Sequence, residues 1–296
     1  MIASVGSRRL SLDPSHPDFI ELSALEDDLL RAVGGQEQLE EKLRSFFRSA
    51  IDEVIDSARS GRFFFSQLEK TEKTYLGTKF EILLRDWLQV PRGIRLDLLI
   101  GGREVDVKST TAMHGWMIPP EAIDQYCILL RVNEGDARCA VGLVRTRPEY
   151  LRPGRNRDAK TGIAAAARTN IWWLVSDFPY TPNFWTIVSQ KDREEIMALK
   201  GGTDRLALLF ERYLRVPISR VQIAAVAAQD DFMKRLRKNG GARDRLAPKG
   251  IAILYSEVDR DLMYALGLRF GYREFLSIKA RNSEEETLLR DAGKIA

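Results

Sequence analysis

The segment RLDLLIGGREVDVKS, residues 95–109, constrains the fold most, because alternating apolar and polar runs flank its pair Gly101-Gly102. A two-residue turn between antiparallel strands needs positive φ at both central positions, which glycine adopts without strain. The pattern therefore predicts a β-hairpin with strands over residues 95–100 and 103–109.

The predicted register decides which side chains of the hairpin meet. Leu98 faces Val105, and Asp97 faces Asp106. Because successive side chains point to opposite faces of a strand, Asp97, Asp106 and Lys108 share one face and the apolar residues share the other. Carboxylates that face each other at roughly 5 Å destabilise a hairpin unless a positive charge lies between them. Asp106 and Lys108 could also be no more than an exposed ion pair, which contributes little.

A divalent cation would turn this repulsion into binding energy. Mg²⁺ prefers one or two carboxylates together with water and a substrate phosphate. The amine of Lys108 would reach the same place, where it could orient or deprotonate an attacking water or stabilise charge that builds on phosphorus. The hairpin therefore predicts metal-assisted hydrolysis of a phosphate ester.

Glu81 permits two interpretations. The T-x-x-E spacing of residues 78–81 is typical of a capping box, so Glu81 could simply cap the helix expected over about 77–88. The apolar positions of that helix leave Glu81 at the flank of its buried side, where it could also point toward the hairpin. Both roles are compatible.

Cysteine and histidine usage excludes several reaction classes. The chain has two cysteines, Cys127 and Cys139, which lie in apolar runs and are expected to be buried thiols, and two histidines, His16 and His114. This excludes a zinc finger and an H-E-x-x-H zinc hydrolase. His114 lies past the lysine in an expected loop, where it is either a structural residue or a DNA contact.

The order of the expected elements predicts two domains in the 296 residues. Residues 1–180 contain two helices separated by Gly34-Gly35, then the hairpin and strands over 126–133 and 137–145, which is an α/β pattern with a mixed sheet flanked by helices. Residues 181–296 are mainly helical with short strands. No apolar run is long enough to cross a membrane and no leader precedes the first domain, so we expect a cytoplasmic protein without membrane contact.

Basic residues concentrate in two stretches, 145–168 and 234–249. Such runs often form only a solvated surface, but their arginine content favours phosphate binding. The second stretch begins in an expected helix-turn-helix, with helices over 219–228 and 231–238; a plain helical hairpin is the alternative. The candidate DNA contacts are Arg155, Asn156, Arg157 and Lys160 in the first stretch, and Lys234, Arg235, Arg237, Lys238, Arg243 and Arg245 in the second.

Several segments resemble the NaeI-type (type IIE) restriction endonucleases, which bind two copies of their DNA site. These are LEKTEKTYLGTKFEILLRDWL, LDLLIGGREVDVK and GWMIPPE, then NRDAKTGI at 156–163 and VAAQDDFMKRLRKNGGARDRLAPKGIAIL at 226–254. The likeness covers most of the chain and is weaker over the first 50 residues and the last 20.

The resemblance implies a restriction-endonuclease-like core and a sequence-specific, Mg²⁺-dependent nuclease that cuts double-stranded DNA as a homodimer. In that family a glutamate, two aspartates and a lysine form the active centre, and the matching positions are Glu81, Asp97, Asp106 and Lys108. The two aspartates and the carbonyl of Val107 would hold Mg²⁺, with Glu81 nearby. A C-terminal helix-turn-helix or winged-helix domain would bind a second DNA copy and activate cleavage.

Two other functions remain open on the sequence alone. The chain could be a DNA-binding regulator whose nuclease-like domain does not cleave, although the complete set of four active-centre positions argues against this. It could also be a repair-type nuclease that nicks one strand. The cut products would separate the three hypotheses.

Overall fold

The computed structural model describes residues 9–271 and 273–295, which form two compact units. Unit 1 contains residues 9–54 and 65–183. Unit 2 contains residues 184–271 and 273–295 together with residues 55–64, which leave the first unit and return to it. The sequence patterns did not reveal this excursion. No helix of the described residues is long and apolar enough to span a membrane.

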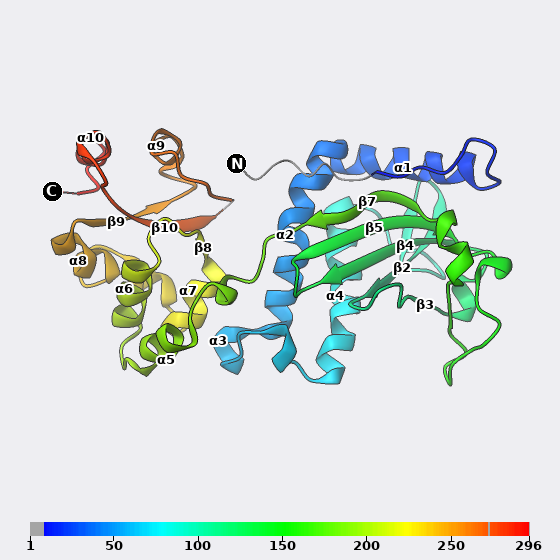
Figure 1. The fold of residues 1–296 in the computed structure, drawn as a ribbon, viewed down its shortest axis with the longest axis horizontal. Coiled ribbons are helices and arrows are strands. Elements are labelled where there is room, and N and C mark those ends of the chain that lie inside the picture. The colour runs from blue at the N-terminus through cyan, green and yellow to red at the C-terminus, as the bar shows by residue number, and fades with distance from the viewer. Residues whose placement is uncertain (1–8, 272, 296) are drawn as a thin grey trace. The chain divides into compact units, whose positions relative to one another are not determined.

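Unit 1 is built on a mixed sheet of five strands in the order β1-β2-β4-β5-β7 (Figure 1). The β2 and β4 strands are parallel, and the other neighbours are antiparallel. A separate two-stranded pair joins β3 to β6. The strands are β1 (Leu98–Ile100), β2 (Arg103–Thr110), β3 (Met117–Ile118), β4 (Tyr126–Asn133), β5 (Arg138–Arg145), β6 (Thr161–Gly162) and β7 (Trp172–Pro179).

Three helices of unit 1 flank the sheet: α1 (Phe19–Val33), α2 (Gln36–Ile55) and α4 (Lys70–Leu88). The expected break between the first two is confirmed, because α1 ends at Gly34, whose φ of 89° is the left-handed conformation that glycine adopts at low cost. The predicted mixed sheet with flanking helices is therefore confirmed for this unit.

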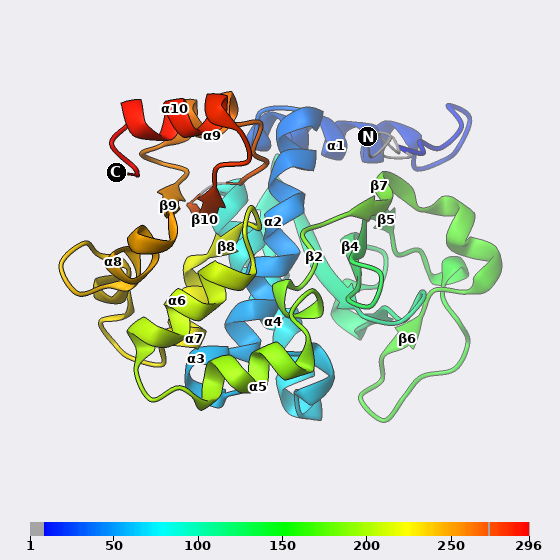
Figure 2. The ribbon, with the colours of Figure 1, turned by 60° about the vertical axis from the view of Figure 1, so that its left-hand side comes forward.

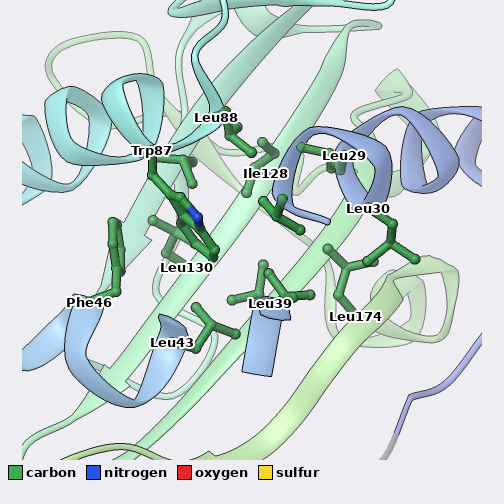
Figure 3. A pocket seen from close by; sticks show the side chains of 13 residues that line it. Leu29, Leu30, Leu39, Leu43, Phe46, Trp87, Leu88, Ile128, Leu130 and Leu174 are labelled. Atoms are coloured by element: carbon green, nitrogen blue, oxygen red, sulfur yellow. The ribbon is translucent and has the colours of Figure 1, made fainter. Parts of the chain in front are cut away.

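Apolar side chains fill both faces of the sheet. On the helical side, leucines of α1, α2 and α4 meet Ile128 and Leu130 of β4 around a cavity of about 20 Å³ (Figure 3). Apolar side chains line this cavity, so a water molecule inside it would find no hydrogen-bond partner. On the other side, Cys127 and Leu129 pack with Trp116 and with residues of the segments between the later strands. Both cysteines are buried free thiols, as expected.

The hairpin has the predicted register. Leu98 pairs with Val105, and the turn residues Gly101 and Gly102 have φ values of 55° and 78°. Positive φ at both positions is the type I′ geometry, which matches the twist of the two strands. The first strand is shorter than expected and begins at Leu98.

Unit 2 packs a three-stranded antiparallel sheet, in the order β8-β10-β9, between two groups of helices (Figure 2). Alternate residues of β9 and β10 contribute to two separate apolar clusters, one on each face. The elements are α3 (Ser57–Ser60), α5 (Gln190–Ala198), α6 (Gly202–Arg212), β8 (Ile218–Ser219), α7 (Arg220–Ala227), α8 (Ala242–Leu246), β9 (Ile251–Tyr255), α9 (Arg260–Ala265), β10 (Glu274–Lys279) and α10 (Ser283–Asp291).

The second helix of the expected helix-turn-helix does not form as an α-helix. The first is present as α7, but residues 231–238 contain only a 3₁₀ helix over Phe232–Leu236. Left-handed residues lie on both sides of it, Ala228 with φ of 50° and Gly240 with φ of 96°. The next α-helix is α8, which starts after Gly241.

Candidate active site

Asp97 is fixed across the hairpin by a backbone hydrogen bond. Although it precedes β1, its Oδ2 accepts from the N–H of Val107 at 2.8 Å. The preceding residues are held by Glu104, whose carboxylate accepts from the N–H groups of Ile94, Arg95 and Leu96 at 2.6–3.1 Å. These bonds lower the pKa of Glu104. Glu104 is thus a support of the site that the sequence patterns did not reveal, because its partners lie in irregular backbone.

Lys108 lies between the two facing carboxylates. Its Nζ donates to Asp106 Oδ1 at 2.8 Å and to the carbonyl of Val107 at 2.9 Å, and lies 3.8 Å from Asp97 Oδ2. Burial lowers the pKa of Lys108, but the attraction of Asp106 and Asp97 outweighs it, so the pKa lies above its ordinary value. The structure therefore brings the three predicted hairpin residues together around one positive charge.

Glu81 does not cap its helix, so the capping-box interpretation is wrong. The α4 helix begins two turns earlier, at Lys70, where Glu69 and Glu72 form the capping box. Gly77 lies one turn before Glu81 on the same face, and a Cβ at position 77 would be 3.1 Å from Ser109 Oγ of β2. This close approach brings the middle of α4 to the strand that carries Asp106 and Lys108.

Electrostatic interactions link Glu81 to the hairpin residues. Burial, and then the charges of Asp97 and Asp106, raise the pKa of Glu81 to about 7, against the opposing effect of Lys108. Burial likewise raises the pKa of Asp106, which is only 4% exposed and accepts a weak hydrogen bond from the Cys127 thiol. The three carboxyl groups and one ammonium group thus interact electrostatically, and repulsion among the carboxylates contributes to the raised pKa values.

This donor set is compatible with a hard cation such as Mg²⁺. Oxygens of Asp106, Val107 and, at longer range, Asp97 already converge on the Lys108 ammonium, and Mg²⁺ uses carboxylate and carbonyl oxygens while keeping several waters. Over residues 9–271 and 273–295, no three His, Cys, Asp or Glu side chains are preformed as a metal-binding group. The protein would therefore supply part of a coordination shell, with water and phosphate completing it.

The first group of candidate DNA contacts lies on an exposed loop that precedes β6. Arg155 and Arg157 are exposed, and Lys160 is half-buried. Asn156 instead shapes the loop, because its side-chain Oδ1 accepts from the N–H groups of Asp158 and Lys160 at 3.0 and 2.9 Å. The amide oxygen of this candidate is thus occupied by the loop itself.

The second group of candidates is heterogeneous. Arg237 and Lys238 are exposed, whereas Lys234 and Arg235 both pair with Asp231. Arg245 is exposed and pairs with Asp204 at 3.3 Å.

Arg243 differs from the expectation of a surface contact. Its guanidinium donates to the carbonyl of Ile253 in β9, and burial lowers its pKa. It anchors α8 to the sheet of unit 2.

The chain matches known restriction enzymes over most of its length. A family model described as restriction endonuclease NaeI matches residues 31–288. A relative from Lentzea aerocolonigenes, described as the type II restriction enzyme NaeI, is 34% identical over 260 residues, which cover 84% of this chain and 82% of the relative. Glu81, Asp97, Asp106 and Lys108 all lie inside the matched region. The chain therefore belongs to the NaeI family of restriction endonucleases.

Proposed function

We propose that this family member is a type II restriction enzyme whose active centre is the cluster of Glu81, Asp97, Asp106 and Lys108, and that it uses Mg²⁺ to hydrolyse double-stranded DNA. Family membership makes it a site-specific deoxyribonuclease. The observation that supports the position of the centre is the single ammonium of Lys108 between two facing aspartates on the hairpin. Unit 1 would be the endonuclease domain.

In this proposal Asp97, Asp106 and the carbonyl of Val107 hold Mg²⁺, with Glu81 nearby. When bound, the ion supplies Lewis acidity and lowers the pKa of a nearby water. The Lys108 ammonium positions the attacking water and stabilises negative charge on the non-bridging phosphate oxygens. The water forms a new P–O bond and loses a proton, the bond from phosphorus to the 3′ oxygen breaks, and that oxygen takes a proton. The products are a 5′-phosphate and a 3′-hydroxyl.

Glu81 suits the transfer of this proton. Burial and the neighbouring aspartates raise its pKa to about 7 in the metal-free site, and a bound cation would lower it again, so the carboxylate would be ionised and able to accept a proton at neutral pH. The preceding turn of α4 holds it against β2 through Gly77, so its position depends on a rigid helix.

Unit 2 is the proposed binding module for a second DNA copy. Its α6, β8, α7, α8, β9 and β10 follow one another as in a winged helix, with β10 in the centre of the sheet and α9 inserted between β9 and β10. The recognition helix would then be α8 rather than residues 231–238. Arg245 and Lys249 are exposed on and just after this helix and would contact phosphates. A homodimer would place two active centres on the two strands of the duplex.

Digestion of supercoiled plasmids with MgCl₂ tests the proposal. The wild type should give discrete linear fragments, and Asp106→Ala should give none while still binding DNA in EDTA. Nicked circles as the end product would indicate a nicking enzyme, and tight specific binding without cleavage in Mg²⁺, Mn²⁺ or Ca²⁺ would indicate a regulator. Either result would refute the proposal.

A further inference from the structure

Two arginines and a histidine, all half-buried, lie beyond the carboxyl end of β2. Thr110, the last residue of β2, pairs with Arg131 on the parallel strand β4. The chain then turns back, so that His114 packs against Trp116 with ring centroids 5.6 Å apart. Arg168 lies on the 3₁₀ helix over Ala165–Asn170, next to Ala167, which packs in the same apolar cluster as Trp116.

Each of these three side chains has a buried nitrogen without a hydrogen-bond partner. The atoms concerned are His114 Nδ1, Arg131 Nε and Arg168 Nε. Arg131 Nη1 contacts only the sulfur of Met113, a poor acceptor. Burial lowers the pKa of His114, and the charges of Arg168 and Arg131 lower it further. Packing like charges together is unfavourable unless an anion joins them.

The backbone at this place is specialised. His114 has a φ of 55°, an uncommon conformation for a residue other than glycine. A Cβ at Gly115 would lie 2.7 Å from Thr110 Oγ1, so the turn is closed tightly against the end of β2. Strain of this kind often occurs where a side chain must be aimed at a ligand.

The cluster lies on the same face as the active centre. Asp106, Lys108 and Thr110 alternate along one face of β2, and Arg131 shares that face because it pairs with Thr110. Two residues of strand separate Lys108 from Thr110, which is roughly 7 Å at the usual rise. A DNA strand advances roughly 3.4 Å along the helix axis per phosphate. A strand whose cleaved phosphate lies at Lys108 would therefore carry a phosphate one or two positions away past the cluster.

We propose that His114, Arg131 and Arg168 form a phosphate-binding subsite that holds one backbone phosphate of the DNA, one or two positions from the phosphate that is cleaved. This inference rests on the proposed nuclease function. The two guanidinium groups supply paired donors, which suit a phosphate better than ammonium groups do. The subsite would fix the position of the strand on the hairpin without reading bases.

The salt dependence of DNA binding tests the subsite without cleavage. In EDTA, the affinity for a duplex that the wild type cuts is measured between 50 and 200 mM salt for the wild type and for Arg131→Gln/Arg168→Gln. If both arginines hold one phosphate, the double variant should reduce the slope of log K against log salt by about one. Arg31→Gln on α1, whose side chain is 74% exposed and pairs with Asp28, is the matched control and should leave the slope unchanged.

An unchanged slope in the double variant would overturn the proposal, because it excludes a phosphate contact. A slope reduced by about two would also overturn it, because this indicates two separate phosphate contacts. If the wild type cuts no DNA, the nuclease function fails instead. The subsite is then still tested with inorganic phosphate alone.

The phosphate test needs no variant of the subsite, so it holds even if the double variant does not fold. The chain has two histidines, so His16→Gln leaves His114 as its single imidazole signal in proton NMR. Inorganic phosphate without metal should shift this signal to saturation and raise the pKa of His114, because an anion stabilises the imidazolium. A signal that phosphate does not move would overturn the proposal.

Discussion

Replacement of Glu81 by glutamine should stabilise the metal-free protein while it impairs cleavage. Burial and the neighbouring aspartates raise the pKa of Glu81 from 4.5 to about 7. At about 1.36 kcal/mol per pKa unit, ionised Glu81 lowers the free energy of unfolding by up to about 3 kcal/mol above pH 7. Because Glu81 is partly exposed to water, we reduce this value to about 2 kcal/mol. Glutamine has nearly the same shape and removes the charge.

The sign of the pH dependence follows from the direction of the shift. Between pH 4.5 and 7 the unfolded state has already released the proton of Glu81, whereas the folded state keeps it. The folded state therefore binds more protons, so the free energy of unfolding falls as pH rises through this window and levels off above it. The Glu81→Gln variant lacks this contribution, so its advantage over the wild type should grow from near zero at pH 4.5 to about 2 kcal/mol at pH 8.

Urea unfolding in EDTA at several values of pH measures this difference. Glu149→Gln, an exposed residue of unit 1, is the control and should follow the wild type at every pH. Adding MgCl₂ should stabilise the wild type more than Glu81→Gln, because a cation relieves the repulsion that the variant has already lost. A difference between variant and wild type that does not change with pH would refute the crowding of carboxylates at this site.

Three further changes test the supports of the two units. Gly77→Leu should push α4 away from β2 and slow plasmid cleavage at least tenfold, while DNA binding in EDTA is preserved. An unchanged cleavage rate would show that the position of Glu81 does not depend on this contact. Glu104→Ala frees the N–H groups of residues 94–96 and should lower the cleavage rate several-fold in a single-turnover assay, and unaltered turnover would exclude its supporting role. Arg243→Leu removes the donor to Ile253 and should lower the free energy of unfolding of unit 2 by about 1–2 kcal/mol in a thermal melt, with no loss expected if Arg243 is only a surface residue.

The hairpin could be predicted from sequence because its determinants are local. Gly101-Gly102 fixes the turn, and strand alternation then places Asp97, Asp106 and Lys108 on one face. The resemblance to a known family supplied Glu81, whose approach to the hairpin depends on the packing of a helix on a strand. No local pattern encodes that contact.

The two incorrect helix predictions have different causes. At α4, the T-x-x-E pattern obscured an equally good start at Glu69-x-x-Glu72, although the apolar spacing of Leu76, Phe80 and Leu84 already extends the helix toward its true beginning. In unit 2, residues 231–238 have helical spacing, but only a 3₁₀ helix forms there, between the left-handed residues Ala228 and Gly240.

The cationic cluster was beyond sequence reasoning for a third reason. His114 and Arg168 are far apart in the chain, and Arg131 joins them through the parallel pairing of β2 with β4. Parallel strands are linked by long connections, so no spacing rule predicts which residues will meet at their ends.

The most direct test of the active centre is the position of a bound metal. Crystals of the wild type soaked in Mn²⁺, which takes the oxygen ligands of Mg²⁺, would reveal the ion by its anomalous scattering. We expect a peak between the carboxylates of Asp97 and Asp106, within reach of the Val107 carbonyl, that disappears in Asp106→Ala. A peak elsewhere in unit 1, or one that persists in the variant, would contradict the account.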